Sequence, residues 1–493
     1  MSDQSSGGHG KFAGVLLLLQ GLLIILFVVF VGYSDDLLPE TVAAKNSKGG
    51  TIDAKYSVFE GLHFMVFIGF GLLMTFLKKY GFSSLGYNFL ISALVIEWST
   101  MMQGFLDMKN SKIQIGLESM IKGDLAAVAV TITFGALLGK TSHHQLLIIS
   151  FIEVILYSAN RAIGTKIFHA VDAGSSMYVH TFGAFYGLAV SRILYKSKIV
   201  AHEKETSRYT SDLFATVGTI VLWVCWPSFN SVLVEGVARQ RAIVNTYYAI
   251  ITSCVTSCAF SALMTKGSKL SMVHLQNASL TGGVAVGTIA PMIIQPWGAV
   301  LIGFVSGALS TSSFKYTQPW LIRRLKVHDT CGVNSLHGLP GILGAVAGTI
   351  SSSIAGYKQY KTSLYTVFPA RAPIFNSTQY FELVKFDPDA VDGLGWSSGK
   401  QAAFQFAALA VTLALAIAGG LLTGVIVKQP FFDPLRDEAL YDDGEFWEVP
   451  ADFRPLSGTV YPPRENGAVQ AEQAESLVQQ EENESEEQAD GQV

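Results

Sequence analysis

Charged residues are scarce in this chain. Asp, Glu, Lys and Arg make up 15% of its 493 residues, whereas a soluble protein of this size carries about a quarter. The net charge of −4 provides no basic footprint for nucleic acid. Half of the residues are hydrophobic and concentrated in long blocks, and the mean hydropathy is +0.37. This pattern is typical of a protein that crosses the membrane many times.

Cysteine is also scarce. All four cysteines lie in or beside apolar blocks: Cys225, Cys254, Cys258 and Cys331. No two of them form a Cys-x-x-Cys pair, so the sequence indicates neither a disulfide framework nor a zinc site. We expect no cofactor, no metal and no enzymatic activity.

Long apolar runs dominate what is present, and a spanning helix needs about 20 such residues. We therefore predict an all-α polytopic membrane protein with about twelve transmembrane helices, at 12–33, 58–78, 83–105, 114–139, 143–161, 174–196, 209–235, 242–265, 270–289, 292–314, 332–355 and 400–428. The predicted organisation is a cytoplasmic N-terminus at 1–11, a transmembrane domain at 12–428, a tail at 429–462 as a candidate for docking on the cytoplasmic face, and a disordered acidic segment at 463–493. The last segment is too polar to fold.

An even number of spans places both termini on one side of the membrane. Lys and Arg residues close to the helix ends favour the cytoplasm for that side, and we expect a plasma membrane protein. The 356–399 loop then faces outward and carries Asn376-Ser377-Thr378, a glycosylation sequon.

Two segments of the chain share a pattern. Asp172 and Asp329 are each followed eight residues later by a histidine, His180 or His337, and a glycine comes seven residues after that. Each segment ends a group of five predicted helices, after one separate N-terminal helix and before a final one. Because five is odd, the second group enters from the opposite face. This is an inverted repeat, a common transporter architecture with its site near the midplane.

The repeat places its histidines at similar depths. At 1.5 Å per residue, each histidine lies about 12 Å beyond the aspartate at its helix start. The two helices begin at opposite faces of a core about 30 Å thick, so His180 and His337 are predicted at nearly one level. Matched histidines favour a transport path over two separate core residues or a haem-ligating pair. Asp172 and Asp329 are interpreted first as N-caps, and Asp172 also as a group that attracts a cation.

Several long motifs identify a family: MVHLQNASLTGGVAVGT (272–288), VHDTCGVNSLHGLPGILG (327–344), DAGSSMYVHTFGAFYGL (172–188), LWVCWPSFNS (222–231) and EFWEVP (445–450). They closely resemble the Rh glycoprotein branch of the ammonium transporter family, from the first helix to about Pro450. The resemblance implies the ammonium transporter fold and a homotrimer in which each subunit has its own ammonia pore. The extra N-terminal helix fits this branch better than the eleven-helix ammonium transporters.

The resemblance assigns roles to single residues. His180 and His337 match the twin pore histidines, and Asp172 matches the acidic residue of the family motif. Phe229 matches one of two stacked phenylalanines at the outer gate. Leu125 stands where the other phenylalanine is usual, which implies a looser or differently shaped gate.

The implied function is a channel that recruits ammonium and conducts neutral ammonia, with carbon dioxide as a second candidate substrate. Phe229, with Trp226 nearby and Asn230 as a hydrogen-bonding group, is the candidate for recruitment. The proton is either returned outside or carried across with the substrate. The alternatives are a non-conducting membrane scaffold that binds a cytoskeletal or other partner through its tail, and a proton-coupled transporter of a larger solute.

Overall fold

The computed structural model describes residues 6–37, 51–386, 388 and 390–450. The predictions for 463–493, and for the end of the 429–462 tail, lie outside the described residues. All twelve predicted spans contain helix. They are α1 (Ser6–Phe30), α3–η2–α4–η3 (Thr51–Phe64, Met65–Gly69, Phe70–Leu73, Met74–Phe76), α5 (Gly81–Phe105), α6 (Leu117–Leu137), α7–η4 (His143–Ala162, Ile163–Ile167), η5–α8 (Ser176–Thr181, Phe182–Ile193), α9 (Tyr209–Ser231), α10 (Gly236–Met264), α11–α12 (Met272–Ala278, Thr281–Val286), α13 (Gln295–Leu325), η8–α14 (Asn334–Gly338, Leu339–Ile354) and α18 (Ser398–Val427).

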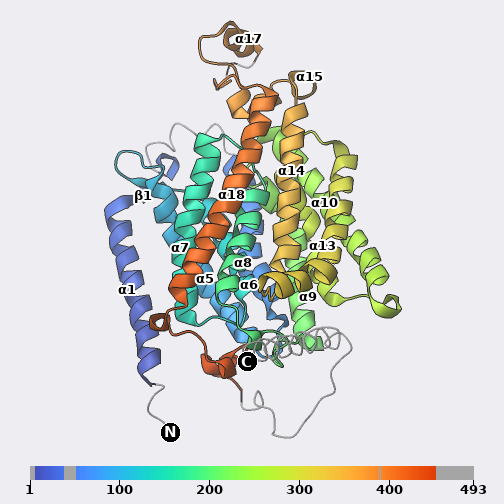
Figure 1. Cartoon of the computed structure of the whole chain (residues 1–493). Coiled ribbons are helices and arrows are strands. Elements are labelled where there is room, and N and C mark those ends of the chain that lie inside the picture. The colour runs from blue at the N-terminus through green and yellow to red at the C-terminus, as the bar shows by residue number, and fades with distance from the viewer. Residues whose placement is uncertain (1–5, 38–50, 387, 389, 451–493) are drawn as a thin grey trace, which may run out of the picture.

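The long helices lie side by side in one bundle (Figure 1). Within the described part, eight helices are long and apolar enough to cross a membrane by themselves. The other four predicted spans are α5, η5–α8, α11–α12 and η8–α14. The last three of these carry many buried residues near the repeated motif. Neighbouring helices surround these three spans, so little of their surface faces lipid and they do not need to be apolar on every side.

The prediction of one continuous helix at 270–289 is wrong. The structure breaks this segment into α11 and α12, and the chain continues through turns at 287–292 before α13 begins at Gln295. Gly282 explains part of this arrangement, since a β-carbon there would collide with the carbonyl oxygen of Ala249. Small residues let α12 approach α10 closely. The contacts between these two helices hold α12 in place, although its helix is not continuous with α11.

Within the described residues, the all-α fold includes one small two-stranded sheet. Strand β1 (Val31–Tyr33) pairs in parallel with β2 (Ile113–Ile115). Both strands lie at ends of predicted helices, where α1 ends at Phe30 and α6 begins at Leu117. Pairing satisfies the backbone groups of these two short segments, which lie outside the helices.

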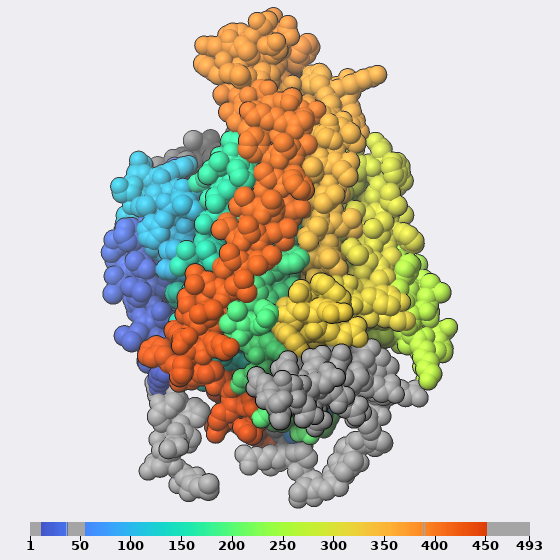
Figure 2. All heavy atoms as spheres, viewed as in Figure 1, coloured from blue at the N-terminus to red at the C-terminus, as the bar shows by residue number. Residues whose placement is uncertain are grey.

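The elements outside the bundle gather at its two ends. Helices α15 (Tyr357–Tyr360), α16 (Ser363–Val367) and α17 (Thr378–Phe386), with η9 (Pro369–Arg371), form the long loop between α14 and α18. The short turns η10 (Pro430–Phe432), η11 (Asp437–Ala439) and η12 (Asp443–Glu445) lie at the opposite end, where α1 begins (Figure 1). Figure 2 shows α18 crossing one face of the molecule between these ends. The remaining turns are η1 (Asp35–Leu37), η6 (Ser197–Ile199) and η7 (Lys266–Ser268).

Candidate functional site

The repeated aspartates cap two matching helical turns. The carboxylate of Asp172 accepts hydrogen bonds from the backbone N–H groups of Met177 (2.9 Å) and Tyr178 (3.0 Å). The carboxylate of Asp329 accepts from Val333 and Asn334, both at 2.9 Å. The capped turns are the π-helices η5 and η8, which contain the two histidines. Both carboxylates therefore satisfy backbone donors at the start of a helical segment, as an N-cap does.

The structure brings the two histidines into contact. Nδ1 of His180 and Nδ1 of His337 are 3.1 Å apart, and the rings meet edge to edge, with centroids 5.1 Å apart and planes 9° from parallel. Both side chains are buried, with 0% and 3% of their surface exposed. One Nδ1 must donate and the other accept, so the pair shares one proton along this bond.

Each remaining ring nitrogen has a defined chemical role because of that shared proton. The imidazole that donates through Nδ1 has a bare Nε2, which accepts, while Nε2 of the other imidazole carries hydrogen and donates. Nε2 of His180 is buried and has no hydrogen-bond partner in the described part of the chain. A buried orphan of this kind points to a ligand or water that it meets there.

Aromatic rings flank the pair in a crossed arrangement. Phe229 and Trp226 of α9 lie 5.3 and 5.8 Å from the His180 ring, and Phe70 of α4 lies 6.1 Å from the His337 ring. The first helix of each group of five thus supplies a ring to the histidine of the other group. Phe70 is not among the residues predicted from the sequence, although it precedes His180 by nearly the same interval that separates Phe229 from His337.

The four predicted gate residues are all inside the protein. Leu125 has 1% of its surface exposed, and Phe229, Trp226 and Asn230 have none. The amide nitrogen of Asn230 donates to the hydroxyl of Thr246 (2.9 Å) and to a backbone carbonyl (3.0 Å). Asn230 therefore ties α9 to its neighbours, and its donors are already used.

A cavity of about 390 Å³ lies at the end of the bundle where Asp172 begins its turn. Its wall contains Asp172 and Tyr178 from the capped turn, and Leu233 and Val234 from the residues that follow Phe229. Through these segments the cavity adjoins the elements that carry His180 and Phe229. Asp172 itself is 7% exposed and also accepts a hydrogen bond from Thr288, and burial raises the pKa of its carboxyl to about 6 against the opposing hydrogen bonds.

The opposite end of the bundle, where Asp329 begins its turn, carries a buried charged network. The ammonium group of Lys140 donates to the carbonyl of His328 (2.5 Å) and to the hydroxyl of Ser191 (3.2 Å). Nε2 of His328 contacts the carboxylate of Glu205 at 3.0 Å. Burial lowers the pKa of Lys140 to about 8, and the neighbouring carboxylates of Glu205 and Asp329 oppose that change.

The described part of the tail packs over this end. The carboxylate of Asp443 accepts from the backbone N–H groups of Phe82 (2.8 Å) and Ser83 (2.7 Å), at the start of α5. The indole of Trp447 donates to the hydroxyl of Ser83 (2.9 Å) and fills a hollow at Gly86, where a β-carbon would collide with the ring. These contacts hold the chain against the bundle as far as the described residues extend.

The fold and this site define a multi-pass membrane protein with an inverted repeat around a buried histidine pair. Comparison with known proteins agrees with that class. The profile of the Ammonium Transporter Family matches residues 21–437, and the chain belongs to this family.

Two similar relatives are of Rh type. The chain is 43% identical over 448 residues to "Ammonium transporter Rh type B" of Danio rerio, covering 89% of this chain and 93% of that one. It is 41% identical to "Ammonium transporter Rh type C" of Homo sapiens, covering 91% of each. Among solved structures, the Rh50 protein of Nitrosomonas europaea superimposes with a TM-score of 0.64 at 27% identity, over 88% of this chain and 98% of that one.

Proposed function

We propose that this chain conducts ammonia across a membrane along the path that contains His180 and His337. The observation that carries the proposal is the hydrogen-bonded pair itself, two buried imidazoles joined at 3.1 Å with one Nε2 left without a partner among the described residues. The pair offers one donor and one acceptor on its free nitrogens, which are the groups that a neutral ammonia molecule needs.

Charge makes the path selective for the neutral molecule. Moving an ammonium-sized ion into a low-dielectric interior has an idealised cost of about 20 kcal/mol. Ammonia lacks that penalty and loses only hydrogen bonds to water, which the imidazoles replace. The neighbours Val179, Phe182 and Leu336 are buried and apolar, and they favour a dry passage.

Recruitment belongs to the outer end of the path. Ammonium is the abundant species at neutral pH, and the rings of Phe229 and Trp226 lie beside His180. A cation over such a ring is stabilised by about 0.5–2 kcal/mol. The ion then loses its proton before the histidine pair, and that proton is either released to the outside solution or carried across with the substrate. Leu125 in place of a second phenylalanine reduces the aromatic surface at this level.

The test is ammonia-driven pH change in proteoliposomes, followed by stopped flow. We expect His180→Ala and His337→Ala each to change or abolish flux while the protein remains folded and monodisperse. Flux under an imposed membrane potential separates neutral flow from a current. Unchanged flux and selectivity in both variants would remove the proposal. Flux no greater than in empty liposomes for the unmodified chain would favour the scaffold alternative, which acts through the tail.

Further properties are proposed with the function. They are a homotrimeric assembly, residence in the plasma membrane with cytoplasmic termini, passage of carbon dioxide, and a tail partner. Asn376 is exposed in the loop before α17 and is the proposed glycosylation site. Light scattering of the purified protein tests the trimer, and glycosidase treatment of the unmodified chain and of Asn376→Gln tests the modification and the orientation of its loop.

A further inference from the structure

The recruitment of ammonium does not explain Arg161, a residue that lines the cavity beside Asp172. We call this cavity the outer cavity. Arg161 lies near the end of α7 and lines the cavity of about 390 Å³ beside Asp172. A guanidinium is always charged and repels an arriving ammonium ion. A cavity that served only to attract cations would not place this group in its wall.

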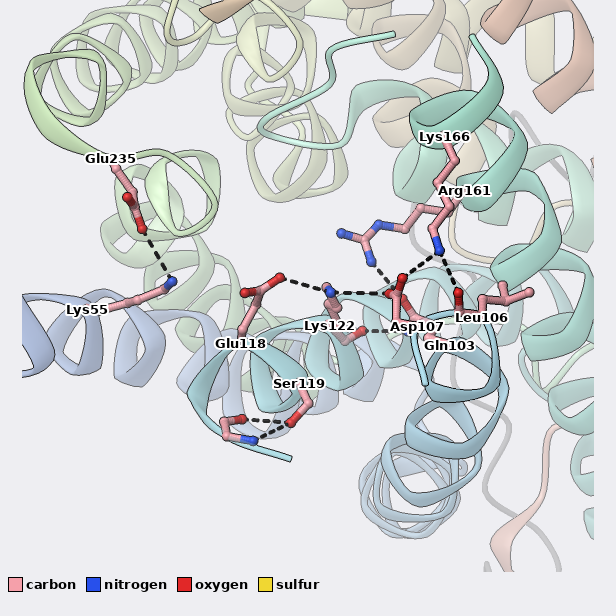
Figure 3. Close-up of polar contacts among 11 residues, drawn as sticks. Lys55, Gln103, Leu106, Asp107, Glu118, Ser119, Lys122, Arg161, Lys166 and Glu235 are labelled. Atoms are coloured by element: carbon pink, nitrogen blue, oxygen red, sulfur yellow. Dashed lines mark hydrogen bonds and ion pairs between the residues drawn. The ribbon is translucent and has the colours of Figure 1, made fainter. Parts of the chain in front are cut away.

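The surrounding charges are paired in a way that leaves Arg161 without a carboxylate. Lys122 contacts Glu118 (2.9 Å) and Asp107 (3.7 Å), and Lys166 contacts Asp107 (2.5 Å). The guanidinium of Arg161 instead donates to the neutral amide oxygen of Gln103, at 2.7 Å. Among the described residues, no carboxylate lies within ion-pair distance of it. In Figure 3 the guanidinium of Arg161 points away from the side chain of Lys166, and a dashed line joins it to Gln103.

Two carboxylates also line the cavity, and each is already engaged. Asp172 accepts hydrogen bonds from Met177, Tyr178 and Thr288. Glu235 contacts Lys55 at 3.6 Å, and its side chain is 74% exposed. In Figure 3, Glu235 and Lys55 lie at the opposite side of the drawn residues from Arg161. Neither carboxylate therefore neutralises the guanidinium by direct contact.

A second, independent feature is Tyr178, a residue of the cavity wall whose hydroxyl is buried beside Gly164 and unused. Tyr178 has 3% of its surface exposed, and its hydroxyl has no hydrogen-bond partner in the described structure. Thr165 and Ser175 also line this cavity. A buried phenol and a charged planar fork beside one cavity together supply the donors that a small oxyanion accepts.

The geometry points to a binding site for a small, planar, monovalent oxyanion at Arg161, of the hydrogencarbonate or carboxylate class. The guanidinium fork matches the two oxygens of such an anion, and the Tyr178 hydroxyl provides an additional donor. A bound anion neutralises Arg161 and removes its repulsion of ammonium. Binding of the anion does not rest on the proposed function. Its expected effect on transport does.

Binding is tested without transport, on the purified full-length chain in detergent. Sodium nitrate serves as the first probe because it is planar, monovalent and unprotonated, and sodium chloride at equal ionic strength is the reference. We expect a saturable rise in melting temperature with nitrate, because a ligand that binds the folded state stabilises it. Hydrogencarbonate and acetate, run in parallel at fixed pH, distinguish the two natural sources of such an anion.

The variants make the assignment specific. Arg161→Gln should lose the nitrate-dependent rise, and Arg161→Lys should retain a smaller one, since it keeps the charge and loses the fork. Lys166→Gln is the matched control, because it removes a neighbouring positive charge that does not line the cavity, and it should keep the full rise. Equal nitrate responses in the unmodified chain and Arg161→Gln would overturn the proposal, as would the absence of a saturable response in the unmodified chain.

Flux measurements separate this proposal from the pore proposal. With methylammonium as substrate, nitrate should lower the half-saturating concentration in the unmodified chain and leave Arg161→Gln unaffected. Loss of flux in the histidine variants with an intact nitrate response would support both proposals. A failed nitrate response with normal histidine dependence would overturn the anion site alone.

Discussion

At the outer end of the proposed path, Asp172 caps its π-helix beside an open cavity, whereas at the inner end Asp329 caps the matching π-helix beside the network of Lys140, His328 and Glu205. The two ends share a scaffold that sets the depth and direction of each histidine. They differ in what covers it. The outer turn meets a polar cavity with a guanidinium that no described carboxylate pairs, and the inner turn lies under buried charges and the packed tail.

Some of these features belong to the repeat and others to one end only. The pair needs two histidines, so each half of the repeat needs a capped turn that carries one of them. The covering groups have no such constraint, and they leave a cavity beside Asp172 and a buried charged network with the packed tail near Asp329. Single substitutions can separate the shared scaffold from its two surroundings.

Removal of the capping carboxylates should have the largest effect and should affect both ends alike. Asp172→Ala leaves three buried donors unpaired and Asp329→Ala leaves two, at about 1–3 kcal/mol for each. We expect a large fall in melting temperature and in folded yield, measured by fluorescence-detected size exclusion. Asp→Asn variants retain an acceptor and should lose less. Equal stability of the Ala and Asn variants would show that capping does not hold these turns.

Truncation of the tail anchor should affect the inner end alone. Trp447→Ala removes an indole that bonds Ser83 and fills the hollow at Gly86. Losses of about 3–5 kcal/mol are usual for a fully buried large aromatic residue. Trp447 is partly buried, so we expect a smaller loss and local undocking of the tail. Trypsin cleavage at Arg436 should become faster while the outer-cavity response to nitrate is unchanged. Unaltered cleavage in Trp447→Ala would show that other contacts hold the tail.

The buried lysine should give the inner end a pH dependence of stability above pH 8, a range higher than that of Asp172 at the outer end, whose pKa is about 6. The pKa of Lys140 is about 8 in the folded protein and 10.5 when unperturbed. Between these values the unfolded chain holds one more proton than the folded chain, so this group makes stability rise with pH. The melting temperature of the unmodified chain should therefore rise relative to Lys140→Met from about pH 8 to about pH 10. A constant difference over that range would contradict the assignment.

The flanking rings should give the smallest effect and should distinguish the two sides of the pair. Phe229→Leu removes a ring beside His180, and Phe70→Leu removes its counterpart beside His337. If cations are recruited only from outside, Phe229→Leu should raise the half-saturating methylammonium concentration for inward flux more than Phe70→Leu does. The expected difference is about 0.5–2 kcal/mol, or roughly 2- to 30-fold in concentration. Identical shifts in both variants would show that neither ring is specific to recruitment.

Some of the site follows from residue spacing. The interval from each aspartate to its histidine, taken with an odd number of helices in each group, predicts His180 and His337 at one depth. The position of both aspartates at a helix start likewise predicts their capping role. Phe70 can also be found from the repeat, because it occupies the place in the first helix of the first group that Phe229 occupies in the first helix of the second group.

Other parts of the site have no signal in the sequence. Arg161 stands in an ordinary run of polar and apolar residues at the end of α7, and its importance comes from Gln103 and the cavity beside it. Lys140 and His328 are 188 residues apart. Asn230 is predicted as a hydrogen-bonding group of the outer vestibule, yet its contacts with Thr246 and Gly283 lie inside the bundle.

The sequence by itself determined the membrane class, the number of spans, the inverted repeat and the level of its two histidines, because hydropathy and helical rise act along one chain direction. Tertiary structure alone decided that the two rings meet through Nδ1, that one Nε2 has no partner among the described residues, and that one aspartate lines a cavity while the other lies beside buried charge. Those outcomes depend on rotation and tilt of packed helices, which bring distant residues together and leave no periodic mark in the sequence.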